Sequence, residues 1–128
     1  AARPRKALPE RETSLLLLTD GEHVLLERRP PTGIWGGLLS LPEGDTATAD
    51  EFARRHGLRL LATQPMAKLK HTFTHFRLNI QAVCCRVERV SGLAGEPGWE
   101  WLDLASIESA ALPTPIRKLL EGLVQGRL

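Results

Sequence analysis

The sequence lacks several features that would assign it to a specialised class of protein. Its best apolar run, Leu15–Leu18, has four residues, far fewer than the roughly 18 that a membrane-spanning helix needs. No secretory signal opens the chain. The two cysteines, Cys84 and Cys85, are adjacent, which excludes a disulfide framework and a four-ligand zinc site. Position 1 is not a methionine and the single Met66 lies mid-chain, so we expect a soluble, intracellular single domain cut from a longer protein.

Acidic residues are absent from one long stretch of the chain. The formal net charge is only +2, yet Phe52–Val87 holds seven Lys and Arg residues and no Asp or Glu, which leaves 10 basic against 15 acidic residues elsewhere. Three of the four histidines lie in the same stretch. Such an asymmetry is typical of a surface that faces a polyanion. The alternative is that basic and acidic segments interleave in space and cancel.

Apolar periodicity and turn signals predict an α+β domain over residues 13–128, preceded by a linker over residues 1–12. Asp20-Gly21 is a strong hairpin turn signal, and the glycines and proline of Ser91–Gly98 indicate a loop. Strands are expected at Thr13–Thr19, His23–Arg28, Leu38–Leu41, Met66–His71, Phe76–Val87 and Trp99–Leu102.

Two helices are expected from their terminal residues. The first runs over about Ala49–His56, started by a capping box in which the Thr48 hydroxyl and the Glu51 carboxylate bond early helix amides. Gly57 then stops it, because glycine readily adopts the left-handed conformation. The second helix begins at Thr114-Pro115, with the threonine as cap and the proline at the first helical position.

The segment Leu41–Gly44 and the helix after it resemble the Nudix box. The core of that box reads Arg-Glu-apolar-x-Glu-Glu-x-Gly-apolar, and Asp50–Leu58 agrees with it at the glycine and apolar positions. The two glutamates that hold divalent metal in that family are Arg54 and Arg55 here, and a guanidinium group cannot ligate a hard cation. The resemblance implies a Nudix-like fold, with a mixed β-sheet flanked by helices, and a degenerate box without metal or pyrophosphatase activity.

A second motif lies at Lys68–Leu78, where a predicted turn carries an aromatic ring, a hydroxyl and an imidazole between cations. Cations suit phosphates, an aromatic ring can wedge beside bases, and short polar groups can bond base edges. The motif therefore suits a nucleic acid. The alternative is that Phe73 is a core residue and that the Lys and His side chains form an ordinary solvated turn.

The same motif resembles the Phe-Ser-His loop in the C-terminal domain of the MutY family of adenine DNA glycosylases. Two further segments support the resemblance, Arg29–Pro42 and Ala111–Lys118, and the order and spacing fit from about Thr13 to Leu120. One departure is that Thr74 stands where the family has serine. The hydroxyl is kept, and the added methyl group restricts its rotamers.

The resemblance implies a domain that recognises 8-oxoguanine opposite adenine in double-stranded DNA. It assigns the reading of the lesion to Phe73, Thr74 and His75, and the neutralisation of phosphates to Lys68 and Lys70. No catalytic residue and no cofactor are expected in this chain. The adenine-removing acids and an iron–sulfur cluster are expected in an N-terminal domain that the chain lacks.

The partners implied are DNA with 8-oxoguanine:A or G:A mispairs and the N-terminal catalytic domain of the same protein, with no membrane. We expect a monomer that works at the nucleoid in a bacterial cytoplasm. Two other functions stay open from the sequence. One is an active Nudix-type hydrolase of nucleoside-diphosphate-linked substrates, and the other is a protein-interaction module on the same scaffold.

Overall fold

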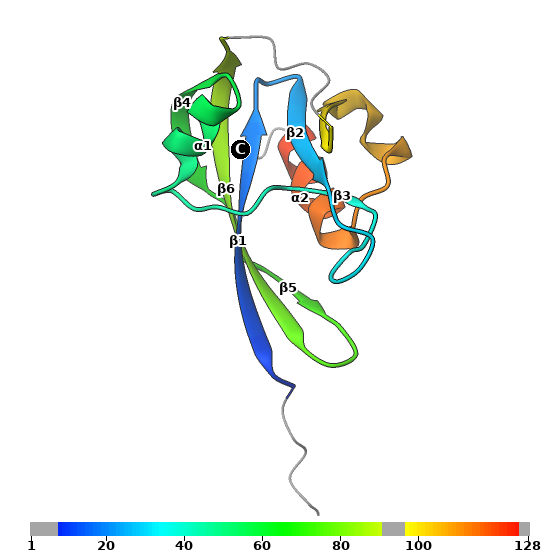
Figure 1. Cartoon of the computed structure of the whole chain (residues 1–128). Helices are drawn as coiled ribbons and strands as arrows, with labels where there is room; N and C mark the ends of the chain where they lie inside the picture. Colours follow the sequence, from blue (N-terminus) through cyan, green and yellow to red (C-terminus); the bar gives the residue numbers. More distant parts are fainter. Residues whose placement is uncertain (1–7, 91–96, 126–128) are drawn as a thin grey trace, which may run out of the picture.

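A computed structural model describes residues 8–90 and 97–125, which form a mixed β-sheet with a helix on each face (Figure 1). The elements in chain order are β1 Glu10–Thr19, β2 His23–Arg28, β3 Leu39–Ser40, α1 Ala49–Arg55, β4 Leu58–Pro65, β5 Leu69–Thr72, β6 Arg77–Arg89, β7 Trp99–Asp103, the 3₁₀ helix η1 Leu104–Ser109 and α2 Thr114–Val124. The α+β class and the mixed, helix-flanked sheet predicted from the sequence are confirmed.

The sheet is built around two long central strands. Its order is β3-β2-β1-β6-β4, with β5 paired to β6 and β7 paired to β2. Strands β1 and β6 run parallel in an unbroken register from Glu10 opposite Arg77 to Thr19 opposite Arg86. Leu15–Leu18 in β1 are all buried, as expected for a central strand covered on both faces.

Two apolar clusters lie on opposite faces of the sheet. Leu15 and Leu17 pack with Ile116 and Leu120 of α2 in the larger cluster. The alternate residues of the strand pack with Phe52 of α1 in the smaller one. The period of two in β1 therefore sends successive leucines to different helices, and Figure 1 shows α1 and α2 on either side of that strand.

The strand predicted at Met66–His71 is confirmed in its second half, which lies in β5, but a strand before it was not predicted. The chain forms β4 earlier, at Leu58–Pro65, and β5 begins only at Leu69. Strand β4 lies at the edge of the sheet and exposes its last five side chains, so it shows no alternation of apolar and polar residues. Met66 lies between the two strands with a buried side chain, and its N–H donates to the carbonyl oxygen of Ala82 over 2.9 Å.

The predicted start of α1 at Ala49 is confirmed, but the capping box before it does not form. The Thr48 side chain makes no cap bond to α1; instead its Oγ1 accepts from the N–H of Asp45 over 2.9 Å. The Thr48 N–H donates back to Asp45 Oδ1 over 3.0 Å, so a local turn takes the place of the capping box. The predicted stop at Gly57 is confirmed by its φ of +70°. In α2 the cap position is Pro113, one residue before the predicted threonine.

The boundary of the predicted linker also moves. Strand β1 begins at Glu10, so the last residues of the range 1–12 belong to the sheet, because they continue the parallel pairing with β6. Most of the loop predicted at Ser91–Gly98 lies outside the described residues. Neither helix within the described ranges has the length and apolar character needed to cross a bilayer.

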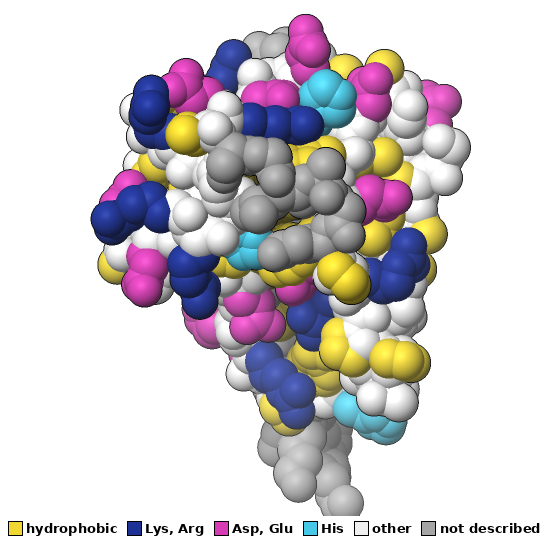
Figure 2. Space-filling view, turned by 45° about the horizontal axis from the view of Figure 1, so that its top comes forward, with side chains coloured by type: hydrophobic (Ala, Val, Ile, Leu, Met, Phe, Trp, Pro, Cys, Tyr) yellow, Lys and Arg dark blue, Asp and Glu magenta, His cyan; other side chains and the backbone are white. Residues whose placement is uncertain are grey.

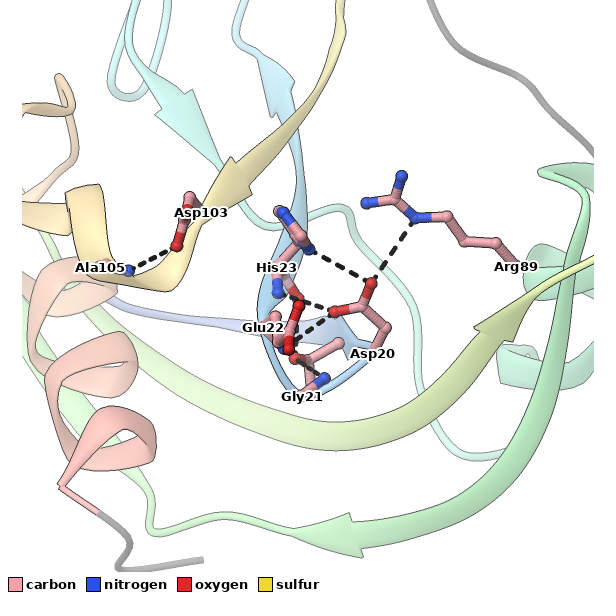
Figure 3. Close-up of polar contacts among 8 residues, drawn as sticks. Asp20, Gly21, Glu22, His23, Arg89, Asp103 and Ala105 are labelled. Atoms are coloured by element: carbon pink, nitrogen blue, oxygen red, sulfur yellow. Dashed lines mark hydrogen bonds and ion pairs between the residues drawn. The ribbon is translucent and has the colours of Figure 1, made fainter.

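The predicted turn between β1 and β2 is confirmed and is fixed by one carboxylate (Figure 3). Asp20 Oδ1 accepts from the N–H groups of Glu22, over 2.9 Å, and His23, over 2.7 Å. Its Oδ2 lies 3.6 Å from the Nε of Arg89 at the end of β6. Burial of the Asp20 carboxyl raises its pKa, but the hydrogen bonds from the turn outweigh burial and leave that pKa below its usual value.

Candidate nucleic-acid interface

Three strand segments form an arm that extends beyond the rest of the sheet (Figure 1). We use the term arm for Glu10–Thr13 of β1 and for Lys68–Ile80, which spans β5, the turn after it and the start of β6. Within the arm β5 pairs antiparallel with β6, from Leu69 opposite Ile80 to Thr72 opposite Arg77. The start of β1 pairs with the other edge of β6. The predicted turn thus lies at the end of a three-stranded projection.

The tip of the arm is a two-residue turn. The N–H of Phe73 donates to the carbonyl oxygen of Phe76 over 2.8 Å, which closes the hairpin around Thr74 and His75. Both tip side chains are exposed. A hydroxyl and an imidazole are therefore presented to solvent at the end of the projection, where a ligand can meet them without any rearrangement of the sheet.

Phe73 is held more firmly than the two tip residues. Its side chain is half-buried and packs against the larger apolar cluster. Its ring stacks on Phe76, with centroids 4.6 Å apart and planes 21° apart, and meets the edge of His71 at 4.7 Å. The sequence left Phe73 as either a core residue or a ring beside DNA bases. In the structure the ring packs against the interior and also borders the tip.

The side chains of Trp35, His71 and Arg11 lie near the tip and were not predicted as site residues. Trp35, from the loop between β2 and β3, has its ring 6.1 Å from that of Phe73 and 6.2 Å from that of His71. On the other side, the Arg11 guanidinium lies 4.4 Å from the Phe76 centroid, a cation–π contact. Period-two alternation places His71 beside Phe73, but the approach of Trp35 and Arg11 depends on tertiary pairing that no local pattern reveals.

The opposite face of the arm is polar. A hollow of about 240 Å³ there is lined chiefly by Lys68, Lys70, Asn79 and Glu12. Both lysines are exposed, and neither lies within 4.0 Å of a carboxylate oxygen among the described residues. We call them the arm lysines. Their ammonium groups are exposed to an external anion, although the charge of Lys70 also acts on Glu10.

Glu10, at the start of β1, bonds one of the residues that line this hollow. Its Oε1 accepts from Asn79 Nδ2 over 3.0 Å. That hydrogen bond, followed by the positive charges of Lys70 and Arg77, lowers the pKa of Glu10 below its usual value. Glu10 therefore stays ionised near neutral pH and offsets part of the positive charge of the arm.

Outside the arm, two basic residues of the acid-free stretch form ion pairs with acids. Arg54 lies 2.8 Å from Asp50, and Arg59 pairs with Glu88 across two strands. Figure 2 shows Lys and Arg side chains alternating with Asp and Glu side chains over the upper part of the molecule. Basic and acidic side chains thus interleave on the body of the domain, as the alternative predicted, whereas the arm lysines form no such pair within the described part of the chain.

The segment that resembles the Nudix box has the expected loop and helix but not the chemistry of a metal site. Arg54 and Arg55 are both exposed on α1, and Arg55 borders a hollow of about 530 Å³ with Glu43, Asp45 and Glu51. Within the described residues no group of three or more His, Cys, Asp and Glu side chains is arranged to hold a metal ion. The residues at the two metal-ligand positions are donors only, so they do not fit a divalent cation.

A family model for the NUDIX domain matches residues 13–122. The chain therefore belongs to the Nudix domain family. Among curated proteins, it is 21% identical to the adenine DNA glycosylase of Buchnera aphidicola subsp. Baizongia pistaciae over 117 residues, which cover 88% of this chain and 32% of that protein. It is 27% identical to the human adenine DNA glycosylase over 135 residues, which cover 91% of this chain and 25% of that protein.

A solved structure agrees with these relatives. The C-terminal domain of mouse MUTYH, crystallised in a complex with human PCNA, superposes with a TM-score of 0.65 at 20% identity, over 92% of this chain and 88% of that chain. The chain spans only about a quarter to a third of the length of the glycosylases that it matches. It is thus a Nudix-like domain related to one part of a DNA-repair enzyme.

Proposed function

We propose that this chain is the lesion-recognition domain of an adenine DNA glycosylase and that the tip of its arm reads 8-oxoguanine opposite adenine. The observation that carries the proposal is the exposed pair Thr74 and His75 at the end of a projection that also presents the arm lysines. The relatives named adenine DNA glycosylase support the parent enzyme, and the tip supplies the chemistry that its recognition step needs.

The lesion differs from guanine in two hydrogen-bonding groups. Oxidation turns the N7 position from an acceptor into an N–H donor and adds a carbonyl oxygen at C8. The Thr74 hydroxyl oxygen can accept from the new N–H, and the His75 imidazole or a backbone amide can donate to the new oxygen. Guanine lacks the C8 oxygen, which would leave the His75 or backbone donor unmatched, and it would require the Thr74 hydroxyl to turn and donate to N7. Discrimination of about 1–3 kcal/mol is therefore expected, or roughly 5- to 150-fold.

The arm lysines would act on the DNA backbone rather than on the base. Contacts to phosphates position a protein on the duplex and carry no sequence information. Removal of adenine, together with the iron–sulfur cluster, belongs in this proposal to an N-terminal catalytic domain of the longer protein. The present chain then contributes recognition and no catalytic residue.

The test is made in the full-length glycosylase with Thr74→Ala and His75→Ala combined. Single-turnover release of adenine is measured from 8-oxoguanine:A and G:A duplexes, and the ratio of the two rates is compared with that of the unmodified protein. We expect the ratio to fall by roughly 5- to 150-fold. Thr74→Ser should keep it, because the hydroxyl survives, and Thr63→Ala on the exposed edge strand is the matched control. An unchanged ratio in the double variant would refute the assignment.

An active hydrolase is the alternative that Arg54 and Arg55 disfavour. The isolated chain should release no pyrophosphate or phosphate from nucleoside triphosphates with magnesium or manganese, since its box offers no pair of carboxylates at the metal-ligand positions. Metal-dependent turnover that co-purifies with this protein, and whose rate is proportional to its concentration, would restore the hydrolase interpretation.

A protein-interaction role is favoured by one observation, the complex of the mouse domain with human PCNA. The two roles differ in their response to salt. Neutralisation of phosphates gives an affinity that falls steeply as salt rises, whereas a protein interface need not show that dependence. DNA binding that is absent at low salt would favour the protein-interaction role for this chain.

A further inference from the structure

The loop between β2 and β3 holds Trp35 in an unusual backbone conformation. Its φ is +54°, and it is the one non-glycine residue with positive φ within the described ranges 8–90 and 97–125. A bulky side chain rarely adopts this left-handed conformation. Such a residue persists only where the surrounding structure holds it, and residues of this kind concentrate at binding and active sites.

The loop is closed by its own backbone. The N–H of Gly37 donates to the carbonyl oxygen of Pro30 over 3.0 Å, and the N–H of Leu38 donates to that of Trp35 over 3.1 Å. Gly36 is packed so tightly that a Cβ there would lie 2.4 Å from the carbonyl oxygen of Pro31. The loop thus has little freedom, and it directs the Trp35 ring in one direction.

That direction is toward the arm. The Trp35 ring is half-buried against the larger apolar cluster and lies 6.1 Å from Phe73 and 6.2 Å from His71. Phe73 is the first residue of the closed turn that carries the tip. Trp35 therefore supports the base of the turn from the body of the domain, although more than thirty residues separate the two in sequence.

We propose that Trp35 is a positioning residue, which holds Phe73 and His71 and so fixes the direction in which the tip meets the DNA. The inference rests on the proposed lesion-reading function of the tip. A group that is fixed before binding loses less conformational freedom on binding, and hydrogen-bond discrimination needs closely fixed geometry. Contacts of the arm lysines with phosphates tolerate small displacements, so overall DNA affinity depends less on Trp35 than lesion preference does.

Two substitutions separate the ring of Trp35 from its backbone. Trp35→Asn keeps a residue that tolerates the left-handed conformation and removes the ring. Trp35→Phe keeps an aromatic ring at the same backbone. We expect the Asn variant of the full-length glycosylase to lose at least about fivefold of its preference for 8-oxoguanine:A over G:A. The Phe variant should stay within about twofold, and neither should alter the dependence of DNA affinity on salt.

A third substitution leaves the ring in place and moves the loop. Gly36→Ala introduces a contact with the Pro31 backbone that the loop must move to relieve, so it should displace Trp35 and reduce the preference as Trp35→Asn does. Its thermal midpoint should fall, and the assay is made at a temperature at which circular dichroism shows the protein folded. If folded Trp35→Asn and Gly36→Ala proteins both keep the full preference, the positioning role is refuted. If the variant with both Thr74→Ala and His75→Ala also keeps the ratio of the 8-oxoguanine:A and G:A rates, the proposed function of the tip is refuted as well.

Discussion

Replacement of the arm lysines gives the most direct test of the proposal that this domain binds DNA. Lys68→Gln and Lys70→Gln remove two positive charges from exposed positions that form no ion pair within the described part of the chain. Neither lysine forms a close ion pair, although the charge of Lys70 acts on Glu10, so the change should act mainly on DNA binding and only slightly on folding. The measured quantity is the slope of log affinity against log salt concentration.

The size of the effect follows from the release of counterions. Each phosphate contact on duplex DNA contributes about 0.9 to that slope, so the double variant should flatten it by about 1.8. At 0.1 M salt this corresponds to a loss of about 60-fold in affinity, and at 0.2 M to about 20-fold. The loss should vanish on extrapolation to 1 M. Fluorescence anisotropy of a labelled duplex, titrated with the isolated chain at several salt concentrations, measures both the slope and the affinity.

A matched control removes the same number of charges from the body of the domain. Arg54→Gln and Arg59→Gln lose cations that already pair with Asp50 and Glu88. This control should change the slope by well under 1, because those charges are neutralised within the protein. The reasoning is wrong if the control flattens the slope as much as the lysine variant does, or if the lysine variant keeps the slope of the unmodified chain.

Two further predictions concern single carboxylates. Glu10→Gln should raise duplex affinity by up to about eightfold at 0.1 M salt, because it removes the anion that competes with phosphate for Lys70 and Arg77; unchanged binding in the same titration would contradict this. Asp20→Ala should destabilise the domain by about 1 kcal/mol at pH 7 through the lost turn hydrogen bonds. Because folding lowers the pKa of Asp20, its contribution is present above the unfolded value near 3.9 and is lost as pH falls through the folded value. Urea denaturation of both proteins from pH 7 to about pH 2.5 should show the difference shrinking, and a constant difference would be the contrary result.

Sequence patterns predicted those elements whose signals are local. Strand β2 follows an Asp-Gly turn, and β6 alternates apolar and polar residues, so both were placed correctly within a few residues. Strand β4 was missed because an exposed edge strand needs no apolar face. The parallel pairing of β1 with β6 was also beyond local patterns, since it joins segments that are remote in the chain.

The candidate site divides in the same way. The turn that exposes Thr74 and His75 was predicted, because one hairpin contains all of it. The support beneath it was not, because Trp35 and Arg11 reach the turn from other strands and loops. Phe73 shows most clearly what local patterns cannot predict. Its residue type suits both the core and a wedge beside bases, and only the tertiary structure shows how much of its ring is buried.

The loop of the segment that resembles the Nudix box packs against β1, whatever residues follow it on α1. The N–H of Gly44 donates to the carbonyl oxygen of Ser14 over 2.9 Å, and the N–H of Leu16 donates to that of Pro42 over 2.8 Å. A Cβ at Gly44 would lie 2.6 Å from the side chain of Leu16, so the loop requires glycine there to press against β1. The same strand continues into the arm and begins at Glu10. The turn of the box therefore anchors the strand that carries the arm, whereas Arg54 and Arg55 lie exposed on α1 and take no part in that contact.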